Sequence, residues 1–117
     1  MTTPSLPEEY RLVELDQCGS SNDEAKRLAS LGALEGTLVW AHRQTAGKGR
    51  RGREWTSERG NLFTSIILRP DCAPLQAVQL TFAAALAVRD TVALHIADGD
   101  AVACKWPNDV LVNGRKI

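Results

Sequence analysis

The most informative stretch of this chain is Gly47-Lys48-Gly49-Arg50-Arg51-Gly52-Arg53-Glu54-Trp55, which holds three glycines, four cations and a tryptophan within nine residues. Glycines disfavour a helix and let the backbone approach a ligand closely, so we expect a loop. The lysine and arginine side chains are charge-assisted donors that suit a carboxylate or a phosphate. The stretch therefore predicts a loop that is mobile when empty and closes over an anionic substrate.

The same basic loop has two plainer interpretations, a solvated surface loop and a nonspecific nucleic-acid patch. The sequence has no Walker pattern, and the G-x-G-x-x-G match from Gly47 to Gly52 lacks the strand–turn–helix context of a dinucleotide site. The net charge is zero, and cations predominate only between His42 and Arg59. Because a general nucleic-acid binder is usually basic throughout, we expect this charge to serve a local anion.

Length and composition are typical of at most one globular domain, with 117 residues, 44% hydrophobic and 24% charged. The three cysteines, Cys18, Cys72 and Cys104, show no C-x-x-C spacing. This disfavours a zinc site or a disulfide framework and predicts a cytoplasmic location. The longest apolar run, residues 80–88, is far too short to cross a bilayer, so no membrane association is expected.

The pattern along the chain predicts a mixed α+β fold. Residues 1–10 are expected to form a leader, and a capping box at Ser21-Asn22-Asp23-Glu24 predicts a helix through about Leu31, ended by Gly32. Apolar residues recur at helical spacing from Leu75 to about Ala97, which predicts a long core helix against a sheet. Strands are expected over residues 11–15, 37–41, 61–68, 101–106 and 109–112, with a hairpin turn at 113–114 leading into a return strand at 115–117.

A second dense motif is Lys105-Trp106-Pro107-Asn108-Asp109. The proline favours an extended Trp106, and Asn108 and Asp109 then stand where a strand or turn ends. Side chains at such a position can face a ligand or a metal ion. An ordinary Asn-Asp turn between two strands remains the alternative.

Two shorter runs accompany these motifs, Gly19-Ser20-Ser21-Asn22-Asp23-Glu24-Ala25 and Gln44-Thr45-Ala46. Together the four runs resemble the catalytic domain of biotin–protein ligases (biotin–[acetyl-CoA-carboxylase] ligases). That family's pattern has Ser-Thr-Asn at a helix start, then Gln-x-x-Gly-Arg-Gly-Arg-x-Gly-Arg-x-Trp, then Lys-Trp-Pro-Asn-Asp and a hairpin lysine. Order and spacing match across about residues 15–117, whereas the related lipoate ligases lack the joint pattern.

The resemblance implies the fold and the chemistry of that family. The fold would be α+β, with a mixed, largely antiparallel sheet and packed helices as in class II aminoacyl-tRNA synthetases, and residues 11–117 would be part of the catalytic domain. The biotin carboxylate would attack the α-phosphate of ATP, giving biotinyl-5′-AMP, and a lysine of a biotin carboxyl carrier domain would then take the biotin. ATP and biotin would be substrates, with Mg²⁺; no DNA is expected to bind, and the resemblance leaves room for a homodimer.

Site residues follow from the resemblance position by position. Ser20, Ser21 and Gln44 would hydrogen-bond the ureido ring of biotin, and Lys116 would contact the biotin carboxylate and the charge developing at the reacting atoms. No direct metal ligand is assigned, although Mg²⁺ is expected near Asn108 and Asp109. The implied biotin set is Ser20, Ser21, Asn22, Gln44, Gly47, Lys48, Gly49, Arg50 and Lys116; the ATP set is Arg50, Arg53, Trp55, Lys105, Asn108 and Asp109; the catalytic residues are Lys116 and Arg50.

Some features depart from the family pattern or allow another interpretation. Lys48 replaces an arginine, so a bidentate side-chain contact is lost, and Ser21 replaces a threonine but keeps the hydroxyl. The alternative role of the serines is helix capping, and the alternative for Trp55 is packing in a core instead of stacking on adenine. Because the family's sheet continues beyond Lys116, the chain is expected to be truncated. It is also expected to lack an amino-terminal DNA-binding domain, because the catalytic pattern begins within about twenty residues of Met1. An inactive biotin-binding fragment, or a nucleic-acid module using Lys48–Arg53, remains open.

Overall fold

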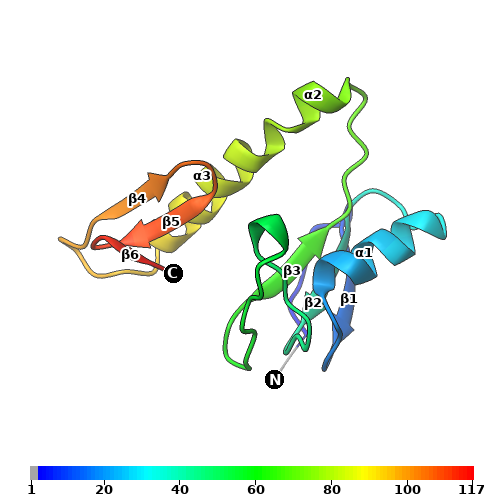
Figure 1. Cartoon of the computed structure of the whole chain (residues 1–117), viewed down its shortest axis with the longest axis horizontal. Coiled ribbons are helices and arrows are strands. Elements are labelled where there is room, and N and C mark those ends of the chain that lie inside the picture. The colour runs from blue at the N-terminus through cyan, green and yellow to red at the C-terminus, as the bar shows by residue number, and fades with distance from the viewer. Residues whose placement is uncertain (1–2) are drawn as a thin grey trace. The chain divides into compact units, whose positions relative to one another are not determined.

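The computed structural model describes residues 3–117 and divides into two compact units, with the boundary along the chain between Arg69 and Pro70 (Figure 1). The first unit contains β1 (Arg11–Leu15), α1 (Ser21–Ser30), β2 (Thr37–Ala41), the 3-10 turn η1 (Arg50–Gly52) and β3 (Phe63–Ile66). The second contains α2 (Pro74–Ala77), α3 (Leu80–Ala93), β4 (Val102–Lys105), β5 (Asp109–Val112) and β6 (Arg115–Lys116). No helix among residues 3–117 is long and apolar enough to cross a membrane.

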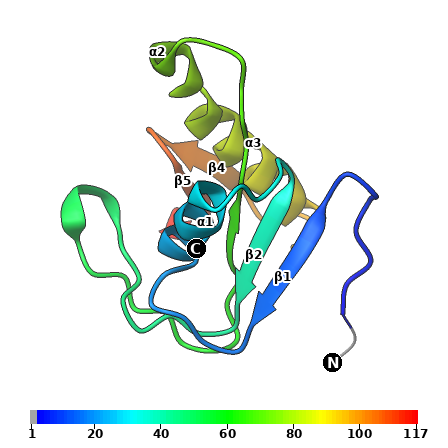
Figure 2. The same ribbon diagram turned by 90° about the vertical axis from the view of Figure 1, so that its right-hand side faces the viewer.

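The first unit is a three-stranded mixed sheet with α1 packed against it. The strand order is β1-β2-β3, with β1 and β2 parallel and β3 antiparallel to β2 (Figure 2). Burial alternates along β2, where Thr37, Val39 and Ala41 are buried. Alternate residues of a strand point to the same face, so these three side chains face inward. Val39 forms a core with Ala25 of α1 and with Ile67. This core packs the middle of α1 against the middle of β2.

Both ends of α1 are set by local hydrogen bonds. The cap is Ser20, one residue before the predicted Ser21, and its hydroxyl accepts a bond from the Asp23 N–H at 3.4 Å. The predicted capping box is therefore shifted, since Glu24 pairs with Arg27 instead of reaching back to the cap. At the other end Gly32 has φ 90°, and the N–H groups of residues 32 and 33 bond back to the carbonyls of residues 29 and 28, as its predicted role as terminator requires.

The second unit is an antiparallel sheet, β4-β5-β6, with α3 packed against β4 and β5. Asn113 and Gly114 both have positive φ, 50° and 78°, which confirms the predicted hairpin turn. The helix predicted over residues 75–97 is instead two helices, with a break after Ala77 and an end at Ala93. The expectation of a buried core helix is also wrong, because Ala85 is the only buried residue described in α3 and a small sheet covers one side of a helix.

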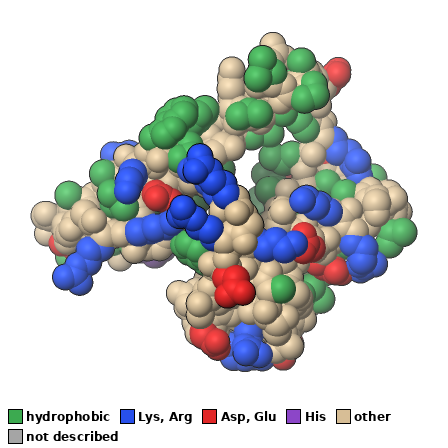
Figure 3. Space-filling view, in the orientation of Figure 1, with side chains coloured by type: hydrophobic (Ala, Val, Ile, Leu, Met, Phe, Trp, Pro, Cys, Tyr) green, Lys and Arg blue, Asp and Glu red, His purple; other side chains and the backbone are tan. Residues whose placement is uncertain are grey.

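The α+β prediction is confirmed, with antiparallel pairing in three of the four strand pairs. The predicted strands occur, although the strand expected over 61–68 is shortened to Phe63–Ile66. The strands form two three-stranded sheets, where a single sheet was expected. Apolar side chains remain exposed over α2 and the start of α3, where Leu75, Val78 and Leu80 are all exposed (Figure 3).

Candidate active site

The beginning of α1 brings together three of the predicted biotin-binding residues. Ser20 and Ser21 are each 5% exposed, while Asn22 is exposed. The Ser21 hydroxyl lies 2.8 Å from the Ser65 hydroxyl, and the Ser21 N–H donates to Oε1 of Gln44 at 2.6 Å. The predicted grouping of Ser20, Ser21 and Gln44 thus exists in the structure, and each of these residues already has a hydrogen-bonding role in the protein.

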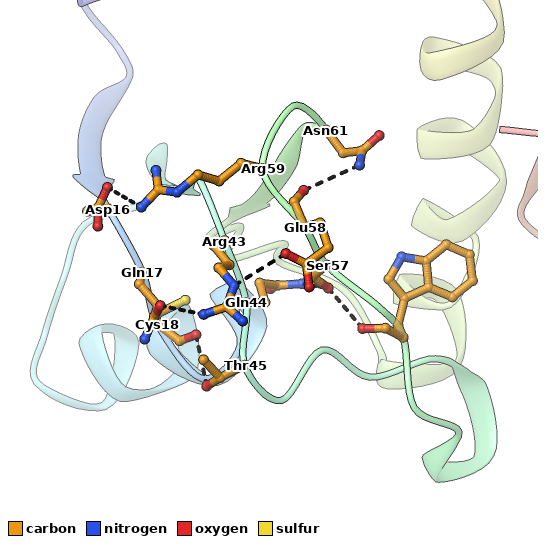
Figure 4. A network of polar contacts seen from close by, with 11 residues as sticks. Asp16, Gln17, Cys18, Arg43, Gln44, Thr45, Ser57, Glu58, Arg59 and Asn61 are labelled. Carbon is orange, nitrogen blue, oxygen red and sulfur yellow. Dashed lines mark hydrogen bonds and ion pairs between the residues drawn. The ribbon is translucent and has the colours of Figure 1, made fainter.

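Gln44 also bonds to Ser57, a residue that the sequence did not single out (Figure 4). The backbone N–H of Gln44 donates to the Ser57 carbonyl at 3.1 Å, and its side-chain Nε2 donates to the Ser57 hydroxyl at 3.0 Å. The Ser57 hydroxyl in turn donates to the carbonyl of Trp55 at 2.9 Å. Only the pairing of the segments on either side of the Gly-rich loop reveals Ser57, because no motif marks it.

Gly47 lies directly against this pair of side chains. A Cβ atom at this position would lie 2.5 Å from the Trp55 carbonyl oxygen and 3.1 Å from Nε2 of Gln44, and it would collide with the Ser57 hydroxyl. The chain therefore needs glycine here so that its own backbone can pass close to Gln44 and Ser57. Contact between Gly47 and biotin stays a prediction.

The Gly-rich loop is a narrow hairpin. Lys48 and Glu54 form an isolated antiparallel bridge, and the N–H of Gly49 donates to the Arg53 carbonyl at 2.6 Å. The tip is η1, in which Arg51 has φ 59°. The predicted ATP residues Arg50, Arg53 and Trp55 are all exposed. Trp55 is 43% exposed, so the alternative that it packs in a core is wrong.

An ion pair joins this loop to the first turn of α1. The Lys48 ammonium lies 2.5 Å from Oδ2 of Asp23, and the hydrogen bond from Lys48 holds the pKa of the Asp23 carboxyl below its usual value. Both side chains are about half exposed. Lys48, a member of the predicted biotin-binding set, therefore pairs with a carboxylate of the chain itself.

An open pocket of about 510 Å³ lies along the loop. Residues 43–48 and 52–58 line the pocket, which therefore includes Gln44, Lys48, Arg53 and Trp55. Ion pairs near it connect Arg43 to Glu58 at 3.5 Å and Arg59 to Asp16 at 2.6 Å (Figure 4). The pocket thus combines hydrogen-bonding groups with cations and an exposed aromatic ring.

The remaining predicted site residues belong to the second unit. Lys105 and Asp109 are register partners where β4 turns into β5, and Asn108 lies in the turn that joins them. Lys116 of β6 places its ammonium 3.1 Å from Oδ1 of Asp109. One end of this sheet therefore gathers two lysines, a carboxylate and an amide. No group of three or more potential metal-binding His, Cys, Asp or Glu side chains occurs among residues 3–117.

The sequence model of the biotin/lipoate A/B protein ligase family matches residues 18–117. The chain belongs to this family. The match includes every predicted site residue of both units, from Ser20 to Lys116. The residues quoted for the resemblance thus lie within the matched segment, whereas their roles in this chain remain proposals.

Two curated members of the ligase family illustrate the likeness. The biotin–[acetyl-CoA-carboxylase] ligase of Paracoccus denitrificans is 46% identical over 103 residues, which cover 88% of this chain and 42% of the relative. The bifunctional ligase/repressor BirA of Bacillus subtilis is 45% identical over 106 residues, covering 90% of this chain and 32% of the relative. The chain therefore spans less than half the length of these two ligases.

Two solved structures of biotin protein ligases share the fold. The Leishmania major ligase in complex with biotinyl-5-AMP matches with a TM-score of 0.78 and 29% identity, over 96% of this chain and 50% of that one. The Aquifex aeolicus ligase in complex with biotin and ATP matches with a TM-score of 0.68 and 34% identity, over 85% of this chain and 40% of that one. Both confirm the predicted biotin ligase-like fold.

Proposed function

We propose that this chain provides the biotin- and ATP-binding part of a biotin–protein ligase. The reaction is ATP-dependent activation of biotin to biotinyl-5′-AMP, followed by transfer of biotin to a lysine of a biotin carboxyl carrier domain. The observation that carries the proposal is one arrangement in the first unit, in which Ser21 and Gln44 meet at the beginning of α1 and a cationic loop with an exposed Trp55 lines the adjoining pocket.

The polar groups at the beginning of α1 suit the ureido end of biotin. A ureido group offers N–H donors and a carbonyl acceptor. Gln44 carries two donor protons and an acceptor oxygen, and Ser20 and Ser21 carry hydroxyls that can donate or accept. These groups are held by bonds within the protein, so they do not have to be ordered when the ligand arrives.

The cations of the loop suit the reacting end. In the first step a carboxylate oxygen of biotin bonds to the α-phosphorus of ATP, and the bond to the β-phosphate oxygen breaks to release pyrophosphate. Both reactants are anions that repel each other, so the protein has to supply cations and correct positions more than covalent chemistry. Lys48, Arg50 and Arg53 supply that charge, and the exposed ring of Trp55 offers a stacking surface for adenine.

The second unit supplies the remaining charges. We assign Lys116 to the biotin carboxylate and the developing negative charge, and Lys105 to a phosphate. The Asp109 carboxylate and the Asn108 amide oxygen are oxygen ligands of the kind that Mg²⁺ prefers when it is held mainly by substrate phosphates. Bound there, Mg²⁺ would neutralise phosphate charge. The Lys116 ammonium lies 3.1 Å from Oδ1 of Asp109, so these two groups are close together.

In the second step the amine of the carrier lysine attacks the acyl carbon of the mixed anhydride. An amide bond forms, AMP leaves with the electrons of the broken C–O bond, and the amine loses a proton. The Paracoccus and Bacillus subtilis relatives are more than twice the length of the chain. Recognition of the carrier is therefore the part of the proposal that depends least on the residues described above.

Two experiments test the proposal against its alternatives. Calorimetry should detect biotin binding to the chain and no comparable binding of single-stranded DNA, which the nucleic-acid interpretation requires. Pyrophosphate release in the presence of biotin and ATP then separates an adenylating chain from an inactive biotin-binding fragment. A chain that binds DNA but no biotin would refute the proposal.

A further inference from the structure

The neighbours of the Ser57 hydroxyl determine in which bond it donates and in which it accepts. Ser57 is 3% exposed, and its single proton is donated to the Trp55 carbonyl oxygen. A carbonyl can only accept, so the Ser57 oxygen is left as an acceptor toward its other neighbour, Nε2 of Gln44, at 3.0 Å. The Trp55 carbonyl thus determines which end of the Gln44 amide faces Ser57.

The other end of the same amide is also fixed. Oε1 of Gln44 accepts from the backbone N–H of Ser21, a group that can only donate. Turning the amide over would set its oxygen against the Ser57 oxygen and its NH₂ group against the Ser21 N–H. Because both contacts oppose that change, the amide has one polarity, and one Nε2 proton and one Oε1 lone pair remain after these bonds are counted.

Packing closes the space around this pair. Gly47 lies against both Ser57 and Gln44, and even a single added carbon would collide with the Ser57 hydroxyl. Gln44 and Ser57 both line the pocket along the loop. The Gln44 amide is therefore held by Ser57 and Ser21 in the lining of a pocket of about 510 Å³.

We propose that Ser57 is a positioning residue that fixes the polarity of the Gln44 amide toward a ligand. The remaining donor and acceptor then favour a ureido or amide group, which has both an acceptor and a donor. They disfavour a guanidinium, which has donors only. The ligand part of this inference rests on the proposed function, whereas the role of Ser57 toward Gln44 does not.

The first test needs no ligand. The side-chain amide of Gln44 is observed by ¹⁵N NMR and assigned by its loss in Gln44→Met. In Ser57→Ala the amide signals should shift, and the proton that bonds to Ser57 should exchange with solvent at least about tenfold faster. Thr37→Val is the matched control, because Thr37 is also buried and also donates its hydroxyl to a backbone carbonyl, that of Leu34, without touching Gln44.

The second test measures specificity with biotin and 2-iminobiotin, in which a guanidinium replaces the ureido group. The wild-type chain should prefer biotin strongly, and Ser57→Ala should reduce that preference by about tenfold while Thr37→Val leaves it unchanged. Ser57→Cys, which keeps a polar atom at this position but is a weaker donor, should change the preference in the same direction. This variant also serves if Ser57→Ala folds poorly.

The outcomes separate the two proposals. Gln44 signals and exchange in Ser57→Ala and Ser57→Cys that match the wild type would overturn the positioning role, whatever the chain binds. Altered Gln44 signals with an unchanged preference for biotin would overturn the claim on specificity. A wild-type chain that binds neither compound would refute the proposed function and the ligand part with it, and the NMR result would then decide the role of Ser57.

Discussion

The ammonium group of Lys48 has two potential partners, the Asp23 carboxylate and a bound anion. The resemblance places Lys48 in the implied biotin-binding set, yet in the structure its ammonium lies 2.5 Å from the carboxylate of Asp23. An incoming anion must therefore compete with Asp23 for the same cation. Lysine suits such an exchange, because its compact ammonium at the end of a flexible stem is less committed to one geometry than a guanidinium.

This competition predicts the effect of Asp23→Asn. Removal of the Asp23 charge should strengthen biotin binding a few-fold, because Lys48 no longer has to leave a carboxylate. Calorimetry measures the change, and Asp16→Asn, which breaks the similarly exposed pair with Arg59, is the control that should leave affinity unchanged. Weaker binding by Asp23→Asn would show that the ion pair helps to build the site.

The same pair has a defined pH dependence. The pKa of Asp23 is lowered in the folded chain, so its contribution to stability is present above the unfolded pKa and is lost as the pH falls through the lowered folded value. NMR titration should find the Asp23 pKa raised toward its ordinary value in Lys48→Met. An unchanged Asp23 pKa in that variant would contradict the pairing.

At Lys116 we expect an effect on rate more than on affinity. In an active ligase that contains this chain, Lys116→Ala should slow adenylate formation by about 10²–10³-fold, because a cation is missing where charge develops. Pyrophosphate release at saturating biotin and ATP measures this, with Arg115→Ala as the neighbouring control. A defect that more biotin cures would limit Lys116 to binding.

At the scale of elements, the hairpin of the Gly-rich loop depends on Gly47. Its backbone passes so close to Gln44 and Ser57 that no side chain fits, whereas a Cβ at Gly49 would make only ordinary contacts of 3.5 Å or more. The two glycines therefore differ in kind, although the sequence presents them alike. One is required by packing, and the other is free of that requirement.

Alanine substitution should separate these two glycines. Gly47→Ala should cost roughly 1–3 kcal/mol of stability, since an over-packed site has to shift its neighbours. Gly49→Ala should cost less, because it meets no close contact and needs no positive φ. Thermal unfolding of the two variants measures the difference, and equal melting temperatures would contradict the packing argument.

We also expect the loop over residues 47–53 to gain protection when ligand binds. Its charged side chains are exposed and its hydrogen bonds are few, so it should open more easily than the sheet. Hydrogen exchange with and without biotinyl-AMP measures this. Unchanged protection of residues 47–53 in a chain that binds biotinyl-AMP would show that the loop does not close over it.

What the sequence predicted at this scale depends on how local each feature is. Gly32 ends α1 and residues 113–114 form a hairpin because neighbouring residues alone determine these turns. The break between α2 and α3 was missed, since apolar spacing continues through it. The contacts of Gln44 with Ser57 and of Lys48 with Asp23 were also missed, because pairing across a loop or between elements leaves no periodic pattern in the sequence.

At the scale of the whole molecule, the predicted site residues are divided between two units. The groups that suit the ureido ring and the cationic loop belong to the first unit, and Lys105, Asn108, Asp109 and Lys116 belong to the second. Motif order along the chain identified both sets, but it carries no information on how firmly each is held. In the second unit, Lys116 stands on β6, a two-residue strand at the edge of its sheet.

This position of Lys116 predicts that the 117-residue chain binds biotin better than it reacts. Binding at the ureido end depends on the first unit, where Ser21 and Gln44 are buried or half-buried and bonded to each other. Catalysis additionally requires the Lys116 ammonium at the reacting atoms, whereas in the structure this ammonium lies 3.1 Å from Oδ1 of Asp109 and must leave that carboxylate to reach a substrate. A misplacement of about 1 Å can cost roughly 10²-fold in rate. Compared with the Paracoccus ligase, biotin affinity measured by calorimetry should therefore be similar, within about tenfold, whereas the rate of biotinylation of a carrier domain should be at least about 10²-fold lower. Biotinylation at the rate of that ligase would show that β6 holds Lys116 well enough without further support.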